Sequence, residues 1–330
     1  MDAAADSDGG LIAGIGLGDA AEPQTLGWDA MADGRPEGFR LCWLHLSQLE
    51  ERSRNWITQQ AGIPDIAAAA LIAQETRPRV QRFDNGVLIV LRGVNLNPGA
   101  NPEDMVSLRI WIERGFMITV RLRRLLAVQD TLAAIQNGYR PEDTDELLVQ
   151  LAERLFRRME PVIDDLEERI DLVDEEQTAS DANQPTRELQ TLRLRTIILR
   201  RYILPQRDAL RQLTSDPPSW FSRQTLSGLS EAADRVIRYV ESLDEIRERA
   251  MVIQDTIQNR SSEELNRRLY ILSIISAICL PIGLLTGLLG INVAGMPGAD
   301  TAWAFWAVTI IMVLIVGLEV WALRTLKWFK

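Results

Sequence analysis

The sequence has 330 residues, of which 46% are hydrophobic and 25% charged, and its formal net charge is −10. A chain of this length can bury a large core, and its negative charge argues against nucleic acid as a partner while allowing a cationic one. It has two well-separated cysteines, Cys42 and Cys279, and a single histidine, His45. We therefore expect two reduced, buried thiols, a structural histidine, no bound cofactor and no enzymatic activity.

Residues 1–37 are rich in Gly, Ala and Asp and lack hydrophobic periodicity, which predicts a disordered tail. Their acidic start lacks the basic and apolar segments of a signal peptide, so we expect a cytoplasmic N-terminus. The glycines from Gly14 to Gly18 do not have the spacing of a nucleotide-binding loop.

Residues 38–140 combine patterns of strands and short helices and predict a cytoplasmic α/β domain. Alternating apolar residues and turn dipeptides indicate one strand and two hairpins. The expected elements are a strand over Arg40–Ser47, a hairpin turning at Asp84-Asn85-Gly86, a hairpin turning at Arg114-Gly115, and helices around Ile57–Ala73 and Leu125–Asn137.

Residues 141–229 predict two long helices of opposite charge. An acidic amphipathic helix is expected over residues 142–181, and a basic helix over Thr186–Leu213. Two interpretations remain open at this point. Either the helices form an antiparallel pair with complementary faces, or both charged faces are simply solvated.

Residues 230–291 predict one stalk helix about 93 Å long, at ~1.5 Å per residue. Its apolar residues from Val236 to Ile257 recur at steps averaging close to 3.5, which indicates packing on other helices in the same chain or in an oligomer.

The stalk helix continues into the first of two apolar segments. Leu269–Ile291 carries no charge, Ala302–Leu323 carries only Glu319, and each reaches the ~20 residues that a bilayer span needs. Basic residues precede the first segment and follow the second, whereas the loop 292–301 between the segments has none. We therefore expect a multi-pass protein with both termini in the cytoplasm, the loop outside, and a basic cytoplasmic tail over 324–330.

The first apolar segment also carries a stripe of small and polar residues at steps of three, four or seven. The stripe comprises Asn266, Ser273, Ser276, Leu280, Gly283 and Gly287. Small residues let helices approach closely in lipid, and polar residues line water. The helix therefore either dimerises tightly or lines a narrow pore built from several copies.

These features resemble the CorA family of divalent-cation transporters over nearly the whole chain beyond the N-terminal tail. The triplet Gly290-Ile291-Asn292 corresponds to the family's Gly-Met-Asn, with Ile291 in place of the methionine. The segments CWLHL, TRPRV and RRYILPQRD, which begin at Cys42, Thr76 and Arg200, are closer to the zinc-transporting branch, ZntB.

The resemblance implies a funnel-shaped homopentamer in the bacterial inner membrane, in contact with lipid. Gly290, Ile291 and Asn292 would form a selectivity filter, and metal would be held only transiently, through Asn292. The pore-lining residues would be Asn266, Leu269, Leu272, Ser273, Ser276, Leu280, Gly283 and Gly287. Asp255 lies where the family has a regulatory aspartate.

The resemblance implies transport of a divalent cation, with Zn²⁺ the first candidate and proton-coupled uptake an open question. The pore-facing groups are amides, hydroxyls and carbonyls, so we expect the ion to pass largely hydrated.

Asp300 either attracts cations at the outer mouth or is a solvated loop residue. Glu319 either pairs with Arg324 or couples protons. The alternatives are a CorA-like Mg²⁺/Co²⁺ channel and a non-conducting membrane-anchored scaffold.

Overall fold

The computed structural model describes residues 8–18, 22–176, 183–291, 301 and 303–325. The chain divides into two compact units, Met1–Gln254 and Asp255–Lys330. The predicted α/β domain and the helices that follow it therefore form one unit, rather than two domains with a boundary near residue 140.

The first unit is built on a seven-stranded sheet with the order β2-β1-β3-β7-β6-β5-β4. Its strands are β1 (Leu11–Leu17), β2 (Gln24–Thr25), β3 (Leu41–Ser47), β4 (Arg79–Arg82), β5 (Val87–Gly93), β6 (Val106–Glu113) and β7 (Phe116–Arg121). Among these pairs only β3 and β7 run parallel.

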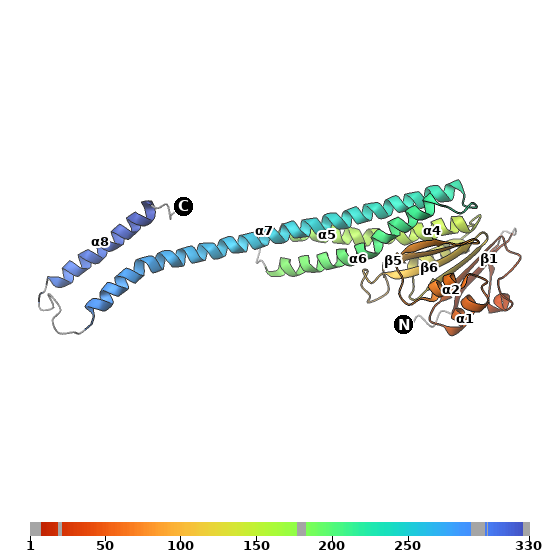
Figure 1. Ribbon diagram of the computed structural model, residues 1–330, viewed down its shortest axis with the longest axis horizontal. Helices are drawn as coiled ribbons and strands as arrows, with labels where there is room; N and C mark the ends of the chain where they lie inside the picture. The colour runs from red at the N-terminus through yellow and green to blue at the C-terminus, as the bar shows by residue number, and fades with distance from the viewer. Residues whose placement is uncertain (1–7, 19–21, 177–182, 292–300, 302, 326–330) are drawn as a thin grey trace. The chain divides into compact units, whose positions relative to one another are not determined.

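The helices lengthen along the chain from α2 to α7, and α8 is shorter again (Figure 1). They are the short 3-10 helix η1 (Trp28–Met31), α1 (Glu51–Gln59), α2 (Asp65–Ile72), α3 (Leu126–Gln136), α4 (Thr144–Arg157), α5 (Glu160–Glu176), α6 (Asn183–Ser215), α7 (Arg223–Leu289) and α8 (Ala304–Thr325). The predicted stalk helix thus begins seven residues earlier than expected, at Arg223 rather than Ser230.

Both predicted hairpins are confirmed. Strands β4 and β5 pair around the Asp84–Gly86 turn, and β6 and β7 pair around Arg114-Gly115. Gly115 has a φ of 73°, in the left-handed region that glycine adopts without strain. The turn chemistry that these hairpins need was therefore visible in the sequence.

The sheet is covered on both faces. Helices α1 and α2 share a hydrophobic core with Leu44, Trp111 and Val120 on one face. On the other face, a side chain at Gly93 would meet Leu155 of α4 and a residue just before α3. The sheet is consequently a buried layer between helices (Figure 1).

The prediction of a disordered tail over 1–37 is wrong for part of that segment. Strand β1 pairs with β3 along its length and buries Leu11, Ile15 and Leu17. The glycines made this strand hard to predict, because glycine lowers β-propensity. In the structure, the same glycines permit close packing. An added Cβ at Gly16 would lie 2.5 Å from the Phe39 ring.

The single acidic helix expected over 142–181 is in fact two helices, α4 and α5. Pro161 lies in the first turn of α5, where proline is tolerated, whereas in a helix interior its ring would clash with the preceding turn. Arg158, which ends α4, forms two hydrogen bonds of 2.6 and 2.8 Å with Asp130 of α3.

The acidic and basic helices do form complementary contacts. Arg195 of α6 lies 3.6 Å from Asp165 of α5, and Arg249 of α7 pairs with Asp171 of α5. The basic helix also reaches beyond the acidic one, because Arg195 pairs with Glu103 at 3.3 Å. The charges therefore join three helices and a loop, rather than one helical pair.

The isolated polar core residues are structural, as expected for His45. Its Nδ1 shares a hydrogen bond of 2.8 Å with the Thr119 hydroxyl, and burial together with nearby Arg121 lowers its pKa to about 3. Burial raises the pKa of the Cys42 thiol to about 12. Cys279 differs from its prediction, because it is exposed on α7.

Candidate functional site

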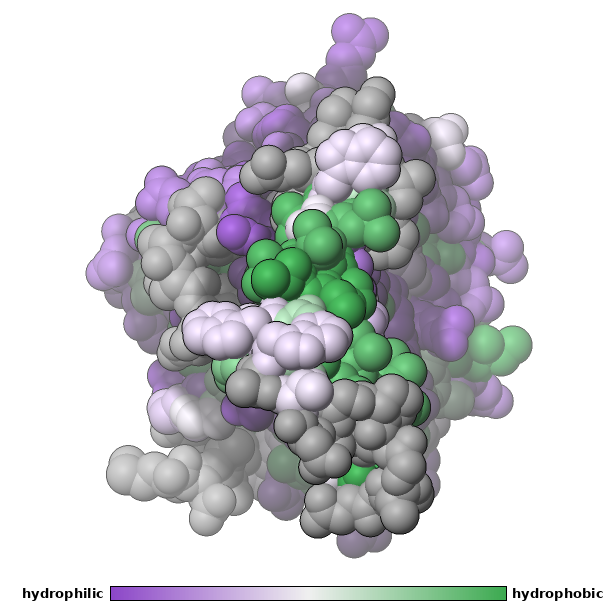
Figure 2. Space-filling view, turned by 90° about the vertical axis from the view of Figure 1, so that its left-hand side faces the viewer, coloured by the Kyte–Doolittle hydropathy of each residue, from purple (hydrophilic) through white to green (hydrophobic). Residues whose placement is uncertain are grey.

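The two predicted membrane segments lie in helices whose apolar side chains face outward. By length and composition, α7 and Ala304–Ala322 could each cross a membrane, and no residue of either apolar window is buried within the chain. Leu272 is 60% exposed and Trp303 is 68% exposed. Figure 2 shows apolar side chains gathered at the surface of this end of the molecule, with pale aromatic rings among them. Lipid or other protein must cover such a surface.

Helix α7 is continuous from Arg223 to Leu289, so its helical periodicity decides which residues share a face. At about 100° per residue, the predicted pore-lining residues occupy one arc of about 120°. This arc, here called the α7 face, holds Asn266, Leu269, Leu272, Ser273, Ser276, Leu280, Gly283 and Gly287, and its line continues to Gly290 and Ile291. Cys279 falls just outside it.

The serines of the α7 face present oxygen lone pairs to the outside. The hydroxyl of Ser273 donates to the Leu269 carbonyl and that of Ser276 to the Leu272 carbonyl, each at 2.8 Å. Because the hydroxyl proton is used inside the helix, the oxygen is left as an acceptor. Acceptors suit the water molecules around a cation, whose hydrogens point outward.

The glycines of the α7 face leave room for close approach. An added Cβ at Gly283 or Gly287 would meet nothing within 4 Å. At Gly290 it would lie 2.9 Å from the Thr286 carbonyl oxygen. A larger residue is therefore disfavoured at Gly290 by its own helix, whereas Gly283 and Gly287 are open to a neighbouring helix.

The α7 face carries no positive charge between Asp255 and Ile291. Over this stretch the basic residues are Arg260, Arg267 and Arg268, which fall at least about 100° from the centre of the arc. All three are exposed. The helix thus keeps its cationic side chains away from the face that holds neutral oxygens.

Two residues of this face were missed in the sequence. Gln258 and Ser262 continue the arc on the N-terminal side of Asn266, and the Ser262 hydroxyl again donates to the carbonyl four residues earlier, at 2.9 Å. Extending the three-and-four spacing backwards would have found them. The same extension reaches Asp255, which is exposed and lies on the α7 face.

Other predicted site residues are only partly described. Asn292 and Asp300 lie outside the described residues, as does the side chain of Arg324. Glu319 is described, and its Oε2 is buried without a hydrogen-bond partner in the described part of the chain. Its pairing with Arg324 therefore stays a prediction.

The donor set of the site is made of neutral oxygens. Within the described ranges, no group of three or more His, Cys, Asp or Glu side chains is placed to hold a metal ion. A tight zinc site uses thiolate or imidazole ligands in tetrahedral geometry, which the residues of the α7 face do not provide. The face can instead contact the water shell of a passing ion.

Comparison with known proteins gives a consistent result over nearly the whole chain. A family model described as "CorA-like Mg2+ transporter protein" matches residues 39–325. The chain is 38% identical over 323 residues to the divalent cation transporter CmaX of Pseudomonas aeruginosa, covering 97% of each chain. It is 36% identical over 288 residues to the zinc transport protein ZntB of Pectobacterium atrosepticum, covering 87% of this chain and 88% of the relative.

The fold agrees with these sequence matches. The solved structure of full-length CmaX superposes with a TM-score of 0.84 at 36% identity, over 98% of this chain and 99% of that one. Sequence and structure therefore point the same way, including the long helix and the C-terminal apolar helix. The chain belongs to the CorA family.

Proposed function

We propose that this protein transports a divalent cation, Zn²⁺ in the first instance, across the bacterial inner membrane. The observation that carries the proposal is the α7 face, a strip of hydroxyls, amides, glycines and leucines that includes Asp255 and has no basic residue on it. A plain membrane anchor or scaffold has no need of such a strip. Members of the CorA family are ion transporters and not enzymes.

The choice of ion rests on the relatives. The name of the ZntB relative favours zinc, and the match covers 87% of this chain. The family description names Mg²⁺, which makes a magnesium channel the second candidate. The side chains of the α7 face do not distinguish the two ions, since amides and hydroxyls can contact the hydration shell of either.

The pathway requires several copies of the chain. One helix face cannot enclose water, so we propose that five copies bring their α7 faces together around an axis. The open space at Gly283 and Gly287 supports this arrangement, because neighbouring helices can approach there. The α8 helices would then lie outside the ring, toward lipid.

The ion would move with most of its water retained. Ser273 and Ser276 would accept hydrogen bonds from that water, and Leu272 and Leu280 would narrow the passage. We place the filter at Gly290, Ile291 and Asn292, with the five Asn292 amides at the outer mouth. Asp300 near that mouth would raise the local cation concentration.

Glu319 is our candidate for proton coupling. A carboxylate in an apolar helix is costly unless it is paired or protonated, and its Oε2 has no partner among the described residues. Asp255 is our candidate for regulation, because it stands exposed on the α7 face before the membrane segment.

The central test is ion flux in proteoliposomes that contain the purified full-length protein. We expect Zn²⁺ entry that exceeds Mg²⁺ entry and increases with an inward proton gradient. Absence of flux for both ions would refute transport. Faster Mg²⁺ flux would favour the second candidate, and insensitivity to the gradient would remove proton coupling.

The filter has its own test. Asn292→Ala should impair or deregulate Zn²⁺ flux while native mass spectrometry still detects a pentamer. Flux identical to that of the unmodified protein would refute the filter assignment, and a different oligomer would refute the five-fold pathway.

A further inference from the structure

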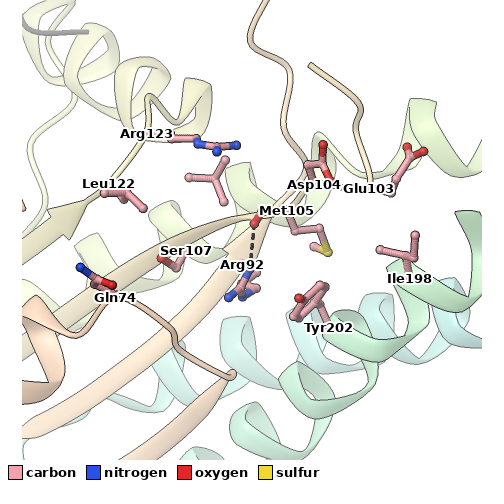
Figure 3. Close-up of a pocket in the computed structure, with 11 residues that line it drawn as sticks. Gln74, Arg92, Glu103, Asp104, Met105, Ser107, Leu122, Arg123, Ile198 and Tyr202 are labelled. Carbon is pink, nitrogen blue, oxygen red and sulfur yellow. Dashed lines mark hydrogen bonds between the residues drawn. The ribbon is translucent and has the colours of Figure 1, made fainter. Parts of the chain in front are cut away.

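A polar pocket of about 380 Å³ lies in the first unit, where the sheet meets α6. Strands β5 and β6 contribute Arg92 and Ser107, and α6 contributes Tyr202. In Figure 3, Arg92 lies among these residues, with Ser107 and Gln74 on one side and Tyr202 on the other. None of these residues belongs to the transport pathway proposed above.

The hydrogen-bond and ring partners of the Arg92 guanidinium are neutral groups among the described residues. Nη1 donates to the Met105 carbonyl at 2.8 Å and Nη2 to the Thr76 carbonyl at 2.6 Å, and the group lies 4.2 Å from the centre of the Tyr202 ring. Its Nε is buried without a hydrogen-bond partner in the described residues. Burial lowers the pKa of this group, as expected for a charge held partly away from water.

A second arginine makes the charge imbalance larger. In the β5–β6 ladder, Arg92 lies opposite Ser107 and Val90 lies opposite Arg109, so all four share one face of the sheet. Arg109 is fully buried and donates to the Ala73 carbonyl at 2.7 Å and to the Gln48 side chain. Burial and the neighbouring charge of Arg92 lower the pKa of Arg109 to about 10.

The described carboxylates near the pocket do not form an ion pair with either arginine, although the charge of Glu75 acts against the lowering of the pKa of Arg92. Glu103 lines the pocket but pairs with Arg195 at 3.3 Å. Asp104 is exposed at the rim, and Arg123 lines the same rim with the opposite charge. No ion pair within 4 Å reaches Arg92 or Arg109 in the part of the chain that the structure describes.

Unused hydrogen-bond donors also face the pocket. Ser107 is only 7% exposed, and its hydroxyl has no hydrogen-bond partner among the described residues. The hydroxyl of Tyr202 likewise has none there, and Gln74 adds an exposed amide. A hydroxyl that makes no hydrogen bond within the described chain, beside a guanidinium that has no ion-pair partner there, is free to donate to a ligand that enters the pocket.

We propose that this pocket binds a phosphate-type oxyanion, either free phosphate or the phosphate of a nucleotide. The ligand would accept from the free donor of Ser107 and from Arg123, and its charge would offset the buried positive charge of Arg92 and Arg109. The volume of about 380 Å³ exceeds the need of one phosphate and leaves room for a larger group attached to it.

The test is thermal unfolding of the full-length protein in detergent, at constant ionic strength, with inorganic phosphate, with ADP free of metal, or with chloride alone. We expect phosphate or ADP to raise the unfolding midpoint in a saturable way, because a ligand that binds only the folded state stabilises it. Tighter binding of ADP would identify a nucleotide, and tighter binding of phosphate the free ion.

Two variants and one control locate the site. Ser107→Ala and Arg123→Gln should each raise the apparent dissociation constant about tenfold, the loss expected for a charge-assisted hydrogen bond. Arg124→Gln removes an exposed neighbouring charge that does not line the pocket and should leave binding unchanged. No saturable shift, an equal shift with chloride, or equal loss in all three variants would overturn the proposal. The measurement involves no transported metal, so it is independent of the transport proposal.

Discussion

Leu44 and Leu280 are the same residue type in opposite surroundings. Leu44 of the sheet is fully buried by the chain itself, whereas Leu280 of the apolar part of α7 is 70% exposed. The contrast extends to the two units. Met1–Gln254 buries a large apolar core among its own helices and strands, whereas no residue of the apolar windows beyond it is buried by the described part of the chain.

The difference shows that the two units depend on different partners. Stability of the first unit should respond to changes in its internal contacts, since its apolar core is buried within one chain. Cation flux through the second unit should depend on which face of α7 is substituted, since we expect lipid and neighbouring copies to supply the contacts of that helix. Two tests can break the first half of this comparison, and two can sharpen the second.

The largest effect is expected at Asp145, a buried carboxylate that ties α4 to the start of α7. Its Oδ2 accepts from the backbone of Ser222 at 2.9 Å and from the hydroxyl of Thr225 at 2.8 Å. Asp145→Ala would leave these donors unsatisfied and should lower the free energy of unfolding by about 3 kcal/mol. Denaturant unfolding followed by near-ultraviolet circular dichroism measures this change.

A matched control for this substitution is Asp165→Ala on α5, a surface ion-pair residue whose side chain is 43% exposed. Its removal should change the free energy of unfolding by less than about 1 kcal/mol. Equal losses for the two variants would contradict the role of Asp145 as a buried cap.

A smaller effect is expected from the titration of His45. The unfolded chain binds a proton at this side chain below about pH 6.5, whereas the folded chain keeps it neutral down to about pH 3. The free energy of unfolding should therefore fall as pH falls through this window, by about 2 kcal/mol between pH 7 and pH 5. His45→Asn retains a side chain that can hydrogen-bond Thr119 and should flatten that part of the pH profile. An identical pH profile in the variant would exclude His45 as the source.

Elements with local signals were predictable from the sequence, and elements fixed by distant contacts were not. The hairpins were found because Asp84–Gly86 and Gly115 carry their own turn chemistry. Strand β1 was missed because its glycines conceal a pattern that only pairing with β3 explains. The small and polar stripe of α7 was predicted from spacing, and Leu269 and Leu272 from the family resemblance. The pairing of Arg92 with Ser107 across β5 and β6 depends instead on strand register, which no local pattern reveals.

The second unit is probed by placing a positive charge on or off the α7 face. Ser262→Arg adds a charge on the face, and Glu263→Arg makes a larger charge change about 100° away. If the face lines the pathway, Ser262→Arg should reduce divalent-cation flux at least about tenfold through direct repulsion. Glu263→Arg should reduce it less. Because Glu263→Arg adds more positive charge, a greater loss in that variant would mean that net charge rather than the α7 face controls transport.

The smallest effect is expected from removing one hydroxyl from the α7 face. Ser276 and Thr286 are both exposed and both donate to the carbonyl four residues earlier, but Thr286 lies about 100° from the centre of the face. Ser276→Ala removes an acceptor for the water around the ion and should lower flux about threefold, the scale of one neutral hydrogen bond. Thr286→Val removes the same chemistry from the side of the helix and should leave flux unchanged. Because the two hydroxyls make the same bond within the helix, a difference between the variants would measure what each one faces, and equal flux in both would show that the hydroxyl of Ser276 does not contact the transported ion's water.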